Sequence, residues 1–422
     1  APTKDEVHAF FKVRGELDES ALATLRHAFF NVALADGTHA RFGTSSEEGV
    51  TTVTVTVVDD VDPIGPEDTV QWSGSGSWST SANWAPATVP GIANKAAFDS
   101  DSAGKEDSID TDAMVGAITF GTGGYTLVGE GSIEIAAEQG AAEIGATAAG
   151  TNTVDVPLYF DTVVNAPLAA GAKVALSQPI AGGGINKTGL GTLALGADNN
   201  FTHGLTLNGG WTELATSRSL GASEVAPAVL KAGGLRFDNA NKTPIVLTRA
   251  VQTAAGDNGL VLEAETEATV PFTSEDGWGG GDDAGGYLYK RGTGGLTLEL
   301  QRNTWITQGS KTPDYSWGIV FDENGLASPD SQVKGSLTVA EGLVRLAPKA
   351  GLDFRPRLTL THDLFVGGIY KSGRANPTLE LDGVALTVQG GGLTLAGMSN
   401  SIVGYWDFDD PEDMGKDLGP NN

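Results

Sequence analysis

Most of the chain consists of short runs in which apolar residues alternate with small or polar ones, bounded by Gly, Asn or Asp. A period of two predicts strands with one buried face, and the bounding residues suit tight turns with positive φ. Strands this short are unstable as isolated hairpins, so they require a barrel, a sandwich or a solenoid. Representative runs are 116–120, 125–128, 132–135, 191–195 and 204–207.

Internal repeats favour the solenoid among these folds. Two segments place a lysine, Lys187 or Lys290, two residues before the first of two spaced glycines, and each continues into an Asn, an aromatic residue and a Thr. A strand–turn–strand unit that recurs indicates stacked coils, here of roughly 20–25 residues each. The repeated segments are 185–195 with 288–298, and 205–214 with 337–346.

At these residues the chain resembles the passenger-associated transport repeat of bacterial autotransporters, with its Lys-x-Gly-x-Gly-Thr-Leu-x-Leu opening. The match is close over 185–214 and looser over 288–346, where an insertion lies around 312–331. The resemblance implies an all-β, right-handed parallel β-helix on a cell surface or in a secreted protein.

A tryptophan-rich segment precedes the repeats. Trp72, Trp78 and Trp84, followed by Pro90-Gly91 and an Ala-Ala-Phe run at 96–98, resemble the opening coil of extracellular β-helix proteins. The tryptophans are expected to cap that coil, because an uncovered parallel stack invites pairing. The alternative is an aromatic platform that stacks on sugar rings.

The two ends differ from the middle. An amphipathic helix from Ala21 to about Gly37 and a Val/Thr strand over 51–58 predict a small α+β or β module. An acidic Pro/Gly segment then predicts a linker, with calcium binding as the alternative. The predicted division is 1–62 for the module, 63–70 for the linker, 71–400 for the β-helix and 401–422 for a C-terminal segment.

The C-terminal segment resembles the first strand and turn of a laminin-G-like, concanavalin-type jelly roll. The similar residues are 404–410 and 417–422, and such a domain needs more sequence than follows them. We therefore expect that the parent protein continues beyond Asn422, or else that the segment is only a terminal strand.

Composition excludes several classes of function. Lys plus Arg number 26 against 53 Asp plus Glu, a net charge of −27, so the basic surface that nucleic acid or an anionic membrane requires is missing. The absence of cysteine excludes disulfides and thiolate chemistry. No apolar stretch approaches 18 residues, so we expect no transmembrane helix.

Candidate catalytic groups are sparse. Two acidic clusters admit a carboxylate pair or calcium, but solvated loops are the favoured interpretation. The histidines lack metal-ligand spacing and form no recognisable triad. We therefore assign no catalytic, cofactor-binding or metal-binding residue, and leave structural calcium open. The residues weighed are Asp99, Asp101, Glu106, Asp107, Asp110, Asp112, Asp282 and Asp283, with Lys95 and Lys105 as nearby cations, and His8, His27, His39, His203 and His362.

These observations predict a non-enzymatic extracellular protein of a Gram-negative-type bacterium: a rigid stalk, an adhesin or a surface-layer component. Any signal peptide is expected to be removed already or to lie outside this segment. Head-to-tail self-association into filaments and contact with cell-surface or extracellular polysaccharide are the expected partnerships. The alternative is a carbohydrate-binding or polysaccharide-degrading β-helix, either a lyase or a glycoside hydrolase.

Overall fold

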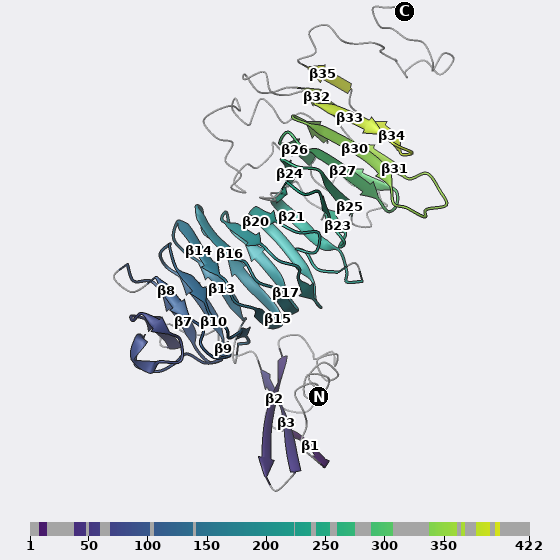
Figure 1. Ribbon diagram of the computed structural model, residues 1–422. Coiled ribbons are helices and arrows are strands. Elements are labelled where there is room, and N and C mark those ends of the chain that lie inside the picture. The colour runs from purple at the N-terminus through teal and green to yellow at the C-terminus, as the bar shows by residue number, and fades with distance from the viewer. Residues whose placement is uncertain are drawn as a thin grey trace, which may run out of the picture.

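The computed structural model describes strands and connections from His8 to Ala396, with gaps (Figure 1). The predicted helix near 21–37, most of the predicted linker and the whole segment 401–422 lie outside the described residues. The described residues are 8–14, 38–47, 50–59, 68–101, 105–137, 141–222, 224–237, 242–253, 260–274, 288–306, 337–360, 364–367, 377–388 and 393–396.

From residue 69 onward the strands form a parallel β-solenoid, which confirms the predicted fold class. Among the described residues, its pairings are parallel except for one antiparallel contact in the first coil, between β4 (Thr69–Trp72) and β6 (Trp84–Ala85). The only helical element described is the short 3-10 turn Ser81–Asn83. The first strand of the solenoid, β4, begins at Thr69, near the end of the predicted linker 63–70.

The strands stack in three ladders along the solenoid. Long strands contribute to two ladders each, because they turn a corner partway along. The first ladder holds β4, β7 (Lys95–Phe98), β10 (Ala117–Phe120), β13 (Glu143–Ala146) and β23 (Val251–Thr253). Three further strands pair only with one another and form a separate parallel sheet: β28 (Thr304–Ile306), β31 (Arg357–Leu360) and β34 (Ala385–Val388). The second holds β5 (Gly76–Ser77), β8 (Glu106–Ser108), β11 (Thr126–Val128), β14 (Gly150–Val154), β16 (Ala172–Leu176), β18 (Thr192–Leu195), β24 (Leu260–Ala264), β26 (Leu288–Arg291), β29 (Leu337–Val339), β32 (Leu364–Gly367) and β35 (Leu393–Ala396). The third holds β9 (Ala113–Val115), β12 (Ile133–Ile135), β19 (Asn200–Phe201), β22 (Ile245–Val246), β27 (Gly295–Leu300), β30 (Leu343–Pro348) and β33 (Thr378–Leu381). The corner-turning strands are β15 (Leu158–Pro167), β17 (Ile180–Thr188), β20 (Leu205–Leu214), β21 (Ala228–Phe237) and β25 (Ala268–Ser274).

Coil length varies more than the sequence pattern predicts. Hydrogen bonds between adjacent coils join residues 19 positions apart at Ile180 and Asn199, and 28 apart at Glu265 and Thr293. The step from Gly292 to its partner Glu341 takes 49 residues, a length that fits the predicted insertion, and the predicted position of that insertion, 312–331, lies outside the described residues.

The interior is filled by rows of apolar side chains that follow the solenoid axis. One row on the second ladder is in register over successive coils, and each member is at most 1% exposed. Burying a Leu or Phe contributes about 1.5–3 kcal/mol, so stability accumulates coil by coil. The row consists of Leu127, Val154, Leu176, Leu195, Leu214, Phe237 and Ala264.

Two corners of the solenoid require glycine, because the backbone of the previous coil lies too close for a Cβ atom. A Cβ atom at Gly183, inside β17, would lie 1.7 Å from the carbonyl oxygen of Thr162 in the previous coil. Gly210, inside β20, has φ +58 and would place a Cβ atom 2.1 Å from the oxygen of Gly191. Both strands change ladder at these points, and only a residue without a side chain allows this approach.

The amino-terminal residues form a separate three-stranded antiparallel sheet in the order β1-β3-β2. Its strands are β1 (His8–Arg14), β2 (Thr38–Glu47) and β3 (Val50–Asp59). The predicted Val/Thr strand over 51–58 is confirmed as the central strand β3.

Candidate functional site

The three tryptophans close the amino-terminal end of the solenoid interior. Trp72, Trp78 and Trp84 are at most 2% exposed, and the ring of Trp84 lies edge-on to those of Trp72 and Trp78 at 4.9 and 4.8 Å between centroids. Trp84 Nε1 donates a hydrogen bond to the Trp78 carbonyl oxygen at 2.8 Å. Phe98 of the next coil packs against all three rings. The predicted cap is therefore confirmed, and these buried rings offer no platform for sugar.

The cap also covers a strand edge. β6 runs antiparallel to β4, with Trp84 opposite Trp72, while the other edge of β4 pairs with β7. β6 thus covers Gln71 and Trp72 on one edge of β4, and stacking of a neighbouring molecule on these two residues would require the cap to move.

The first acidic cluster does not converge on one point. Asp101 accepts hydrogen bonds from Thr122 Oγ1 at 2.7 Å and from Lys105 Nζ at 3.4 Å. Asp110 accepts one from Ser79 Oγ at 2.5 Å, and these bonds lower the pKa of both carboxyl groups. Asp112 accepts from the Ser132 backbone and hydroxyl at 2.9 Å each. The carboxylates thus tie neighbouring coils together at the surface.

The remaining members of that cluster lie apart from these contacts. Glu106 is exposed, Asp99 lies against Gly121 of the next coil, and Lys95 is on β7. Among the residues that the structure describes, no three His, Asp or Glu side chains are grouped to hold a metal ion. The acidic pair Asp282 and Asp283 lies outside the described residues.

Asp107 differs from its neighbours because its side chain points into the interior. It is 0% exposed, and neither carboxylate oxygen has a hydrogen-bond partner among the described residues. Burial, with a further contribution from the charge of Asp110, raises the pKa of Asp107 to about 8. The sequence analysis favoured a solvated loop for the acidic cluster that contains Asp107, and for Asp107 this interpretation is wrong.

The histidines form no visible catalytic arrangement in the part of the chain that is described. His203 is exposed and its Nδ1 lies 2.9 Å from Thr202 Oγ1. His8 and His39 lie on β1 and β2, and His27 and His362 are outside the described residues.

The repeated lysines hold corners of the solenoid. Lys187 and Lys290 are both 0% exposed. Lys187 Nζ donates to the carbonyl oxygens of Gly189, at 3.2 Å, and of Gly209 in the following coil. Lys290 Nζ donates to those of Gly292, Gly294 and Glu341 at 2.5, 2.9 and 3.0 Å.

This contact explains why lysine precedes the spaced glycines. The glycine corner turns its carbonyl groups toward the interior, where they need donors, and a lysine supplies an ammonium group with three hydrogens. Burial lowers the pKa of Lys187 and of Lys290 to about 8 each. The repeat was visible in the sequence, but its lysine chemistry was not inferred from it.

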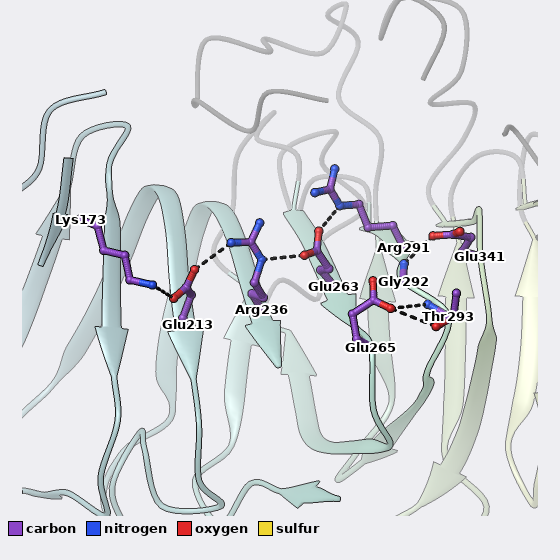
Figure 2. A network of polar contacts seen from close by, with 9 residues as sticks. All are labelled: Lys173, Glu213, Arg236, Glu263, Glu265, Arg291, Gly292, Thr293 and Glu341. Carbon is purple, nitrogen blue, oxygen red and sulfur yellow. Dashed lines mark hydrogen bonds and ion pairs between the residues drawn. The ribbon is translucent and has the colours of Figure 1, made fainter. Parts of the chain in front are cut away.

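A row of alternating charges follows the outer face of the second ladder. We call Lys173, Glu213, Arg236, Glu263 and Arg291 the axial charge row (Figure 2). They come from β16, β20, β21, β24 and β26, and each carboxylate lies between two cations. Arg236 donates to Glu213 at 2.8 Å and to Glu263 at 2.6 Å, and Arg291 also donates to Glu263. The row therefore links coils along the axis.

The ring of Trp211 packs against the two arginines of the axial charge row. It is 7% exposed and stands opposite Gly234 of the next coil, which leaves room for the indole. The guanidinium carbons of Arg236 and Arg291 lie 4.4 and 5.1 Å from its ring centroid. These are cation–π distances, so the indole helps to hold both arginines in place.

The outermost link of the row should contribute little. Lys173 and Glu213 have 35% and 17% of their side chains exposed. We expect Lys173→Gln, which removes only this link, to lower the free energy of unfolding by less than about 1 kcal/mol, and the difference to shrink with added salt. Urea denaturation at low and high NaCl measures this, with Glu380→Gln in the more exposed Arg345–Glu380 pair as the control. A loss that does not depend on salt would contradict the expectation.

Comparisons with known proteins add no identification. No protein-family model, no curated protein and no solved structure matches this chain. In the described part of the chain, no helix is long and apolar enough to cross a membrane.

Proposed function

We propose that this chain is a structural protein of the bacterial cell surface or extracellular space, in which the solenoid acts as a rigid stalk or adhesin shaft. The observation that carries the proposal is the axial charge row. Glu213, Arg236, Glu263 and Arg291 bind one another across successive coils, and Lys173 reaches Glu213 past the intervening strand β18, so these ion pairs strengthen the stack. The resemblance of 185–214 and 288–346 to passenger-associated repeats supports the location.

Rigidity is tested by small-angle X-ray scattering of the whole chain. A compact globular chain of 422 residues has a radius of gyration of about 22 Å, and the proposal expects a clearly larger value with the scattering profile of a rod. A value near 22 Å would contradict it.

Location is tested by protease treatment of intact source cells, which should degrade a surface protein and spare an internal one.

The proposal includes no enzymatic activity and no required cofactor. Incubation with acidic and neutral polysaccharides should release no reducing ends, and release would favour the polysaccharide-degrading alternative.

The melting temperature should be the same in calcium and in EDTA, whereas a higher melting temperature in calcium would establish a structural ion. Electron microscopy of concentrated protein tests filament formation by stacked copies.

A further inference from the structure

One interior row of the solenoid begins with a carboxylic acid. In the parallel register, Asp107 of β8 stands directly before Leu127, and the row continues through Val154. Asp107 thus occupies an apolar position next to the tryptophan cap. The Nε1 atom of Trp78, in that cap, also lacks a hydrogen-bond partner among the described residues.

The strands that pack against β8 bring it no compensating charge. β5 supplies Gly76 and Ser77, and β11 supplies Thr126, Leu127 and Val128, none of which titrates. On the same segment, Glu106 is exposed and Asp110 is exposed and bonded to Ser79. Lys105 is directed to Asp101, at 3.4 Å, and to the Tyr125 ring, at 4.1 Å from its centroid.

We propose that Asp107 is a proton-linked lock on the amino-terminal coils, which stay closed while its carboxyl group is neutral and open when it loses its proton. A neutral carboxyl group without partners costs little more than another buried polar group. A carboxylate in the same place must regain water, and it can do so only if β8 separates from its neighbours.

The direction of the pH dependence follows from proton linkage. The pKa of Asp107 is about 8 in the folded chain and 3.8 in its ordinary state, so between these values the closed form binds the proton that the open form releases. Closure is therefore favoured at low pH, weakens as pH rises from about 4 to about 8, and changes no further above that range.

Hydrogen exchange followed by mass spectrometry tests the lock on the full chain. After correction for the intrinsic rise of exchange with pH, protection of a peptide covering 105–128 should fall by about tenfold per pH unit from pH 5 to pH 8 and then level off. A peptide covering 172–195 should show no such slope. In Asp107→Asn the slope should vanish, whereas Asp110→Asn, the matched control, should retain it.

Two results would overturn the proposal: flat protection of 105–128 in the unmodified chain, or an unchanged slope in Asp107→Asn. Should that variant fail to fold, Asp107→Leu restores the apolar row and serves the same purpose. Infrared spectroscopy of the unmodified chain gives an independent readout. The carbonyl band of a protonated carboxylic acid should be present at pH 6 and lost by pH 9, and its absence at pH 6 would also refute the lock.

Discussion

Replacing Lys290 by methionine should lower the free energy of unfolding by about 3 kcal/mol or more. Methionine fills a similar volume but leaves the carbonyl oxygens of Gly292, Gly294 and Glu341 without the ammonium donor. Glu341 belongs to the next coil, so the substitution also weakens the contact between coils. Urea denaturation followed by circular dichroism measures the loss.

The control for this prediction is Lys231→Met. Lys231 is an exposed lysine of β21, so its replacement should change the free energy of unfolding by less than about 0.5 kcal/mol. Lys187→Met should be intermediate, because Lys187 Nζ makes two such bonds instead of three. Equal stability of Lys290→Met and Lys231→Met would mean that the corner carbonyls need no ammonium group.

The fold was predictable from the sequence because its signal is local. Short alternating runs bounded by Gly and Asn specify strands and turns, and the Lys-x-Gly-x-Gly repeat at 185–195 and 288–298 indicates stacking. The tryptophan cap was predictable for a related reason, since three large apolar residues at the start of a stack have an interior to fill.

The side-chain contacts between coils were not predictable in the same way. Lys187 meets Gly209 across 22 residues, and Lys290 meets Glu341 across 51, because an insertion separates their coils. Coil lengths vary, so the sequence does not show which residues stand in register. Asp107 illustrates the consequence: only its register with Leu127 reveals that it points inward.

Glu263→Gln should be the most damaging single change in the axial charge row. Glu263 is 9% exposed and its two carboxylate oxygens accept from Arg236 and Arg291 separately. Burial acts to lower the pKa of Arg236, but the attraction of Glu263 and Glu213 leaves it above its ordinary value. Glutamine has the same shape but no charge, so two guanidinium groups over the Trp211 ring would lose their shared carboxylate. We expect a loss of about 3 kcal/mol in the free energy of unfolding.

A double variant distinguishes this electrostatic cause from a packing defect. If the loss arises from two uncompensated cations, then Glu263→Gln combined with Arg291→Met should be more stable than Glu263→Gln alone, because only Arg236 remains and Glu213 still binds it at 2.8 Å. Additive losses in the double variant would show that the two side chains act independently. The charge row would then be a set of separate surface contacts, and the rigidity proposed for the solenoid would have to come from its backbone ladders and apolar rows alone.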